Sequence, residues 1–398
     1  MASTYLTRTP SSTGSQTKFT FSCWLKKCSI GVGGALYSCG NATNANYYTD
    51  ARFSTEDKLT LNWYDDNGNH TITTNQLFRD SSAFYNIVIA WDTTQATASN
   101  RVKIYVNGTQ ITSFSNADYV NQNQAMLFNT VSKPIDIGRR VNNTDYLNGI
   151  LSHVHGIDGT AYDASAFGST DSTTGEWKIN TSPSVTYGTN GFFILKDGNS
   201  VTDQSGNSNN FTVGGGTLTK TEDCPSNVFA TWNPLARFNG NFNFSNGNTS
   251  VSAPSGTWNG SIATMGFNSG KWYWEAKFSG NADNQYIGVF DESANPATNN
   301  PMNRTGTTAF YNYNGGEMIK DGSFTTADYG TITSSQICGV AVDADNNTIS
   351  IYRDGVAIVS NYALSTTKNL LFPFISVYAT TADYNFGNGY FGTTAVAT

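Results

Sequence analysis

Two clusters of tyrosine and asparagine hold the side chains best suited to binding chemistry. They are Asn44-Ala-Asn46-Tyr47-Tyr48 and Ala309-Phe-Tyr311-Asn312-Tyr313-Asn314, and in an extended chain Tyr311 and Tyr313 lie on the same side. An aromatic ring stacks on the C–H groups of a sugar, and neighbouring amides fix its orientation without any charge. The alternative is that these tyrosines only cover the edges of a core. The candidate ligand-binding residues are Asn46, Tyr47, Tyr48, Tyr311, Asn312, Tyr313 and Asn314.

Catalytic arrangements are missing from the sequence. Cleavage of a glycan needs two carboxylates that converge on one bond. The pairs Glu56-Asp57, Glu222-Asp223 and Asp291-Glu292 are adjacent, so in a strand their side chains point to opposite faces, and we expect them to be solvated turn residues. No Gly-x-Ser-x-Gly elbow, phosphate-binding glycine loop with Lys or His-Glu-x-x-His motif occurs. The sequence predicts no catalytic residue and no enzyme, and a polysaccharide-cleaving enzyme is the least favoured alternative.

Two short motifs offer metal ligands, but each has a simpler structural interpretation. His153-Val-His155 would place both histidines on one face of a strand, yet no cysteine or carboxylate cluster flanks the pair. The Asp343-Ala-Asp345-Asn-Asn turn has oxygen ligands in the style of a calcium site but lacks the spaced glycine and terminal glutamate of an EF-hand loop. We predict no metal and no cofactor, with calcium as an unsupported alternative.

Composition places the chain among surface proteins rich in β-structure. Charged residues are 13% of its 398 residues, against about 25% in ordinary globular proteins. The net charge of −7 argues against binding to nucleic acid, because neutralising phosphates requires clustered lysine and arginine. No stretch approaches the ~20 apolar residues that cross a bilayer, and no secretion signal opens the chain. We expect a protein made in a host cytoplasm and released by lysis, as virus particles leave bacteria.

The five cysteines give no framework for disulfides. They form no Cys-x-x-Cys pair, and their odd number leaves at least one thiol unpaired. We expect them to be small buried hydrophobes: Cys23, Cys28, Cys39, Cys224 and Cys338.

The same hairpin pattern occurs twice, at Ile87–Ile111 and at Cys338–Ile358. In each copy an apolar strand ends at an Asp, and an Ile-Tyr strand then runs into Asn107-Gly108 or Asp354-Gly355, turns that suit a two-residue hairpin. A chance match is the alternative, because such hairpins are common. The repeat and the chain length together favour two sandwich domains of related architecture.

Five blocks follow one another in the first half of the chain: Phe19–Trp24, Trp91-Asp92, Val102–Gly108, Ile137-Gly138 and Leu147–Ser152. In this order they resemble a laminin-G-like domain of the concanavalin A-like lectin and glucanase superfamily. The resemblance implies a jelly-roll sandwich, and members of this superfamily usually bind sugars or proteins.

Six ordered blocks span the last third or more of the chain: Lys271–Glu275, Gln285–Phe290, Cys338–Asp343, Ile349–Gly355, Leu371–Val377 and Tyr384–Gly387. Together they resemble an SPRY domain. The resemblance implies a bent β-sandwich whose loops at one end hold a partner, typically a protein segment.

Residues 158–232 are less regular and predict one short helix capped near Asp163. The segments Asp203–Thr212 and Cys224–Leu235 resemble a segment that recurs in virion proteins of tailed bacteriophages. The glycines at 214–216 and the prolines that follow mark the best domain boundary, near residue 232.

The sequence therefore predicts an all-β chain of two antiparallel, jelly-roll-type, concanavalin A-like sandwiches in series. Residues 1–232 form the laminin-G-like sandwich with an irregular C-terminal extension, and residues 233–398 form the SPRY-like sandwich. The predicted function is a non-enzymatic phage virion surface protein, in a tail fibre, appendage or head fibre, that binds host-surface glycan or protein during adsorption. The alternative is a structural decoration or connector subunit of the capsid or tail.

The expected partners are a host-surface glycan or protein and other virion structural proteins. Appendages of this kind are often trimers by resemblance, so we expect a homo-oligomer without nucleic acid or membrane insertion.

Overall fold

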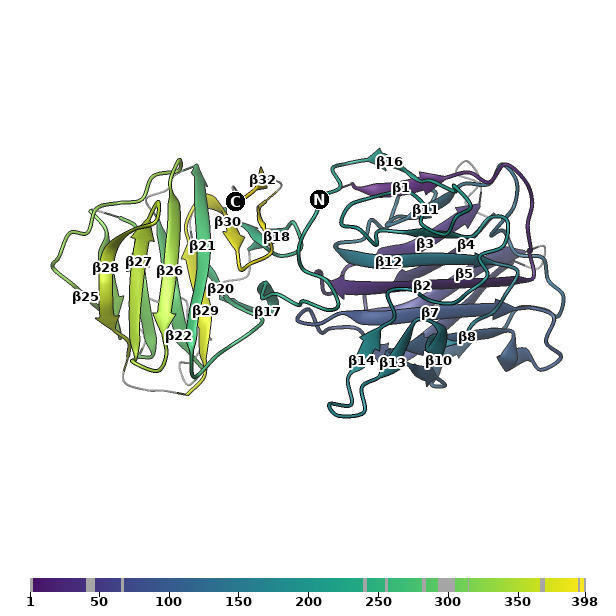
Figure 1. Cartoon of the computed structure of the whole chain (residues 1–398), viewed down its shortest axis with the longest axis horizontal. Helices are drawn as coiled ribbons and strands as arrows, with labels where there is room; N and C mark the ends of the chain where they lie inside the picture. The colour runs from purple at the N-terminus through teal and green to yellow at the C-terminus, as the bar shows by residue number, and fades with distance from the viewer. Residues whose placement is uncertain are drawn as a thin grey trace. The chain divides into compact units, whose positions relative to one another are not determined.

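The chain forms two compact units, residues 1–228 and 229–398. In Figure 1 the first unit runs from purple to teal and the second from teal through green to yellow. The sequence boundary was placed after Trp232, which here opens the first strand of the second unit. The computed structural model describes residues 3–40, 47–65, 68–238, 242–254, 257–280, 284–292, 305–313, 315–365, 369–392 and 394–396.

The first unit is a sandwich of two antiparallel sheets. From edge to edge, the eight-stranded sheet contains β10 (Phe114–Ala117), β6 (Gly68–Leu77), β5 (Lys58–Asp65), β4 (Tyr48–Phe53), β3 (Gly34–Gly40), β11 (Ile135–Ile137), β1 (Tyr5–Arg8) and β16 (Thr212–Gly215). The six-stranded sheet contains β15 (Phe192–Ile194), β12 (Gly149–Asp158), β2 (Lys18–Lys27), β7 (Tyr85–Asp92), β8 (Val102–Val106) and β9 (Thr109–Ile111).

The second unit repeats this architecture with two seven-stranded antiparallel sheets. The first contains β17 (Trp232–Phe238), β20 (Asn259–Ala263), β29 (Leu371–Val377), β22 (Gln285–Asp291), β23 (Thr307–Tyr311), β24 (Glu317–Lys320) and β25 (Ser323–Phe324). The second contains β18 (Asn243–Ser245), β19 (Ser250–Ser252), β30 (Thr380–Asn385), β21 (Lys271–Gly280), β26 (Ile337–Asp343), β27 (Thr348–Arg353) and β28 (Val356–Ala363). A small hairpin, β31 (Tyr390–Phe391) with β32 (Thr394–Ala395), follows. The prediction of two all-β sandwiches in series is confirmed.

Alternating apolar residues build both cores. In the first unit Leu61 of β5 and Ile89 of β7 are fully buried members of one apolar cluster between the sheets. In the second unit Val340 and Ile351 pair across β26 and β27 and belong to the corresponding cluster. The period of two, visible in the sequence, therefore decides which face of each strand enters the core.

Both predicted hairpin turns are present. Asn107 and Gly108 have φ angles of 47° and 81°, and Asp354 and Gly355 have φ angles of 48° and 79°. Two consecutive positive φ angles match the right-handed twist of the flanking strands, which is why Asn-Gly and Asp-Gly are favoured there.

An excursion of the chain, residues 159–190, covers the outer face of the six-stranded sheet. It contains the 3-10 turn η2 (Ala164–Ala166) and the hairpin β13 (Gly168–Thr170) with β14 (Trp177–Ile179). Asp163 caps η2 by accepting a hydrogen bond from the Ser165 amide, as the predicted short capped helix required. Apolar side chains of the excursion pack with Val88 of the sheet. The other 3-10 turn in the described residues is η1 (Ala98–Asn100), and none of the helices described is long and apolar enough to cross a membrane.

Two consecutive lysines of β2 form buried ion pairs. Lys26 Nζ lies 2.8 Å from Asp223 Oδ2, and Lys27 Nζ lies 2.7 Å from Asp57 Oδ1. All four side chains are at most 2% exposed. Neighbouring strand residues point to opposite faces, so each lysine fixes a different segment to the sheet.

The expectation that the adjacent carboxylate pairs are solvated is wrong for three aspartates. Asp57 and Asp291 have no exposed surface and Asp223 is 3% exposed. Asp291 accepts hydrogen bonds from the backbone and side-chain amides of Asn369. These aspartates are buried because each has a partner from a distant part of the chain, which compensates its desolvation.

The two histidines of the His153-Val-His155 motif have structural roles. A β-bulge between Ser152 and His155 interrupts the strand, and His153 has a φ of 48°. His155 Nδ1 lies 2.9 Å from the Tyr187 hydroxyl, and its ring stacks 4.0 Å from that of Phe193. No group of three metal-ligating side chains occurs in the described parts of the chain.

None of the five cysteines, all of which lie within the described residues, takes part in a disulfide. Four are buried, as predicted, and Cys224 is half-buried. Burial raises the pKa of the Cys28 thiol to about 12, so it remains protonated and unreactive at neutral pH.

Replacing Lys26 with Met should lower the free energy of unfolding by about 3–5 kcal/mol, because it leaves Asp223 charged and buried without its partner. Urea unfolding of the full chain measures the change. Lys58→Met is the matched control: it breaks an ion pair with Glu56, a residue whose side chain is 70% exposed, and should cost at most about 1 kcal/mol. Equal losses in the two variants would contradict the special role of the buried pair.

Stability should fall as the pH falls from about 6.5 towards 4. Burial lowers the pKa of His153 to about 4 and that of His155 well below its usual value. In this window the unfolded chain binds protons that the folded chain does not, so each histidine removes up to about 1.4 kcal/mol per pH unit. Urea unfolding at pH 7, 6 and 5 gives the slope, and His155→Phe should make it shallower. An unchanged slope in this variant would refute the assignment of part of the pH dependence to His155.

Candidate binding sites

The outer face of the eight-stranded sheet carries a network of charged side chains. In β4, Thr49, Ala51 and Phe53 pair with the inward residues of β5, so Asp50 and Arg52 point outward. Asp50 is nonetheless fully buried. We call the group of Asp50, Arg52, Asn62, Arg140 and Asp145 the arginine–aspartate network.

Asp50 is the centre of this network. Its carboxylate accepts hydrogen bonds from Asn62 Nδ2 at 2.8 Å and from Arg140 Nε at 2.9 Å. Arg52 reaches from Asp50 to Asp145, with Nη1 3.2 Å from the Asp145 carboxylate. Burial disfavours the charge of Arg140, but Asp50, Tyr48 and Asp145 together outweigh this effect and raise the pKa of the guanidinium.

Tyr48 covers the arginine–aspartate network, and Tyr47 stands beside it. The Arg140 guanidinium lies over the Tyr48 ring at 4.6 Å, and the Tyr48 hydroxyl donates to Asn69 Oδ1 at 3.2 Å. Tyr47 is 44% exposed, with its ring 5.9 Å from that of Tyr64. Paired charges hold Tyr48 in place, and such a fixed polar surface suits a neutral ligand rich in hydroxyls. Asn46, the third candidate of this cluster, lies outside the described residues.

In the second unit, Tyr286, Tyr311 and Tyr313 form a tyrosine stack. Tyr286 of β22 pairs directly with Tyr311 of β23, and their rings lie 4.2 Å apart at an angle of 3°. The Tyr311 ring lies 5.4 Å from that of Tyr313, at 30°. The predicted placement of Tyr311 and Tyr313 on one side agrees with this contact. Exposure rises along the stack, from 1% at Tyr286 to 37% at Tyr313.

Further aromatic rings surround the stack. The Trp258 ring lies 5.0 Å from that of Tyr286, and the Phe324 ring lies 5.7 Å from that of Tyr311. Phe324 is 43% exposed. Burial raises the pKa of both Tyr286 and Tyr311, so their hydroxyls stay protonated at neutral pH.

Asn312 lies between two stack residues but points into the protein. It is fully buried; its Nδ2 donates to the Ile332 carbonyl at 2.8 Å, and its Oδ1 accepts from the Ile332 amide at 2.7 Å. This placement does not fit the predicted ligand contact, because both polar atoms of the amide are used in holding the Ile332 loop. Asn314, the other predicted amide, lies outside the described residues.

Sequence reasoning missed the residues that support both surfaces. Tyr286 had a usable signal: β22 reads Tyr-Ile-Gly-Val-Phe, and apolar residues at consecutive positions indicate a strand buried on both faces. Asp50 and Arg52 had a weaker signal, a charged pair at alternate positions of an otherwise apolar strand. A calcium ion at Asp343, the unsupported alternative from the sequence, would compete with Lys271, whose Nζ lies 2.8 Å from the Asp343 carboxylate.

Comparison with protein families identifies the two units. The model of the concanavalin A-like lectin/glucanases superfamily matches residues 2–164, and that of the SPRY domain matches residues 271–389. A concanavalin A-like domain and an SPRY domain are thus present, in that order. The arginine–aspartate network belongs to the first, and Tyr286, Tyr311 and Tyr313 belong to the second. Both are binding-type domains and fit a binding role.

Similar solved structures include two SPRY domains and a pentraxin. The SPRY domain of human HERC1 has 16% identity, covering 39% of this chain and 98% of that chain, with a TM-score of 0.33. The TRIM65 PSpry domain has 14% identity, with coverage of 39% and 89% and a TM-score of 0.34. The native heptameric SAP-like pentraxin from Limulus polyphemus has 15% identity, with coverage of 40% and 71% and a TM-score of 0.29. No curated protein matches the chain.

Asn312→Ala should destabilise the SPRY domain by about 2–4 kcal/mol, because it leaves the buried amide and carbonyl of Ile332 without partners. Hydrogen exchange of peptides from residues 315–340 in the full chain measures the local loss. Asn346→Ala is the control, since its side chain bonds an exposed turn and should cost under about 1 kcal/mol. Equal protection in both variants would show that Asn312 does not hold the loop.

Proposed function

We propose that this chain is a non-enzymatic binding protein on the surface of a tailed-phage virion, where it attaches to host-surface glycan or protein during adsorption. The observation that carries the binding role is the tyrosine stack. Tyr313 offers an exposed ring whose tilt is fixed by Tyr311 and Tyr286 beneath it. A ring that is already ordered loses little conformational entropy on binding, so stacking energy is not spent on ordering the site.

The phage assignment rests on sequence. The segments Asp203–Thr212 and Cys224–Leu235 resemble a recurrent segment of tailed-phage virion proteins. On this proposal the chain is made in the host cytoplasm, lies on the virion surface in a tail fibre, appendage or head fibre, and is released by lysis.

A homo-oligomer is part of the same proposal. The edge strand β28 has eight residues, and its Val356 is 68% exposed. A long edge strand presents unpaired backbone groups, which a second copy of the chain can cover.

Tyr313→Ala should weaken binding of the full chain to extracted host-surface polysaccharide by about three- to tenfold, the usual worth of one aromatic contact. Isothermal titration with micromolar protein measures this. Tyr273→Ala is the matched control, since Tyr273 is 53% exposed and its hydroxyl bonds Glu275 outside the stack. Equal losses in the two variants, or no binding by the unmodified chain, would refute the proposed site.

Immunogold labelling of purified particles tests the location separately. Label on fibres or on the tail supports attachment, whereas label spread evenly over the head favours a decoration subunit. Particles without label would refute a virion protein.

A further inference from the structure

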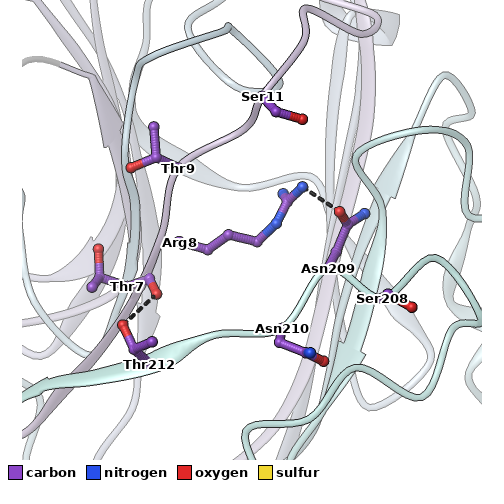
Figure 2. A pocket seen from close by; sticks show the side chains of 8 residues that line it. All are labelled: Thr7, Arg8, Thr9, Ser11, Ser208, Asn209, Asn210 and Thr212. Carbon is purple, nitrogen blue, oxygen red and sulfur yellow. Dashed lines mark hydrogen bonds between the residues drawn. The ribbon is translucent and has the colours of Figure 1, made fainter.

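A polar pocket lies in the first unit, away from the arginine–aspartate network. Its volume is about 430 Å³, within the range of small-ligand sites. Figure 2 shows that one wall comes from the chain around Arg8, with Thr9 and Ser11, and the other from the segment with Ser208 and Asn209. None of its eight lining residues is aromatic or apolar, so this pocket binds through hydrogen bonds and charge.

Arg8 is the only charged side chain in the lining, and all of its described hydrogen bonds go to neutral oxygens. One Nη donates to Asn209 Oδ1, and the guanidinium also donates to the Asn190 carbonyl at 3.3 Å and to Asn190 Oδ1 at 3.5 Å. No carboxylate of the described residues lies within ion-pair distance. Burial lowers the pKa of the guanidinium, with partial compensation from Asp203 and Asp158.

Those two aspartates are occupied by amides. Asp158 accepts from the backbone amides of Ser15 and Asn190 at 2.7 Å and 3.0 Å. Asp203 accepts from the backbone amides of Phe193 and Asn209, each at 2.8 Å. Their negative charges favour the protonated Arg8 guanidinium from a distance, but neither carboxylate forms an ion pair with it.

Asn209 holds its oxygen towards Arg8. Its Nδ2 donates to the carbonyls of Thr189 and Gly191, at 2.9 Å and 2.7 Å, so the amide can present only its oxygen to the guanidinium. The wall containing Asn209 is the Asp203–Thr212 segment, which the two domain matches leave unassigned. Asp203 accepts hydrogen bonds from Ser205 and from the Asn209 amide, and Ser208 and Asn210 of the same wall are exposed.

We propose that this pocket binds the carboxylate of an acidic sugar, with Arg8 as the anion-binding residue. The Nε–H and one N–H of Nη1 of Arg8 make no described hydrogen bond, and such charged donors suit the oxygens of a carboxylate. The surrounding hydroxyl groups of Thr9, Ser11 and Ser208 suit the hydroxyls of a pyranose ring. A single arginine among neutral groups fits one negative charge better than a phosphate, which carries more. The site stands independently of the tyrosine stack.

The test is titration of the full chain with trigalacturonate and with its fully methyl-esterified counterpart, in which each carboxylate is replaced by a neutral ester. The acid should bind at least about tenfold more tightly, and Arg8→Gln should remove the difference. Lys103→Gln on β8 is the control that removes the same charge elsewhere. Ser208→Asp provides a second variant: it places a carboxylate at the rim while keeping the hydrogen bonds of Arg8, and should weaken binding of the acid to a similar extent.

Tyr313→Ala should leave trigalacturonate binding unchanged, which separates this site from the proposed function. Equal affinity for the acid and the ester would overturn the inference, as would full binding by both Arg8→Gln and Ser208→Asp. If acetate competes for the pocket as strongly as trigalacturonate does, the inference that the ligand is a sugar acid would be overturned.

Discussion

Burial of both faces of the central strands is the constraint on which the rest of the structure depends. Every residue of β22, and nearly every residue of β2, is buried. One face of each strand enters the sandwich core, and the other must be covered by something else. In the first unit the excursion of residues 159–190 provides that cover, and in the second unit a row of aromatic residues does so. The excursion in the first domain and the tyrosine stack in the second thus have the same structural role, because each covers the outer face of a sheet.

The same constraint explains the charges in the interior. Lys26 and Lys27 lie in a strand with no exposed face, so each needs an anion brought from elsewhere. Asp223 supplies one, and it joins the end of the first unit to the C-terminal end of β2. Asp57 supplies the other and also accepts from Arg79. The charged residues that are scarce in this composition are therefore used to connect segments across the sheets.

Local features of the sequence could be predicted, and features set by distant partners could not. The Asn107-Gly108 and Asp354-Gly355 turns depend only on adjacent residues, and the alternation of Val340 and Val342 depends only on the strand itself. The burial of Asp223 depends on a lysine 197 positions away. The support of Tyr311 by Tyr286 depends on the register of two strands. Neither pairing can be found from one sequence, although the tyrosine cluster and the burial of the strand that contains Tyr286 were visible.

The two matching hairpin turns differ in what surrounds them. A β-carbon at Gly108 would lie 2.5 Å from the Trp177 ring, whereas one at Gly355 would meet nothing within 4 Å. Trp177 belongs to the excursion of residues 159–190, and its indole also donates to Asn86 Oδ1 at 3.0 Å. The excursion therefore packs directly on the first turn. The second turn is free at its tip. For protein engineering, the loop at Asp354-Gly355 is therefore the place to insert an epitope or a fluorescent label. An insertion at Asn107-Gly108 would instead displace Trp177 and expose the face of the sheet that the excursion covers.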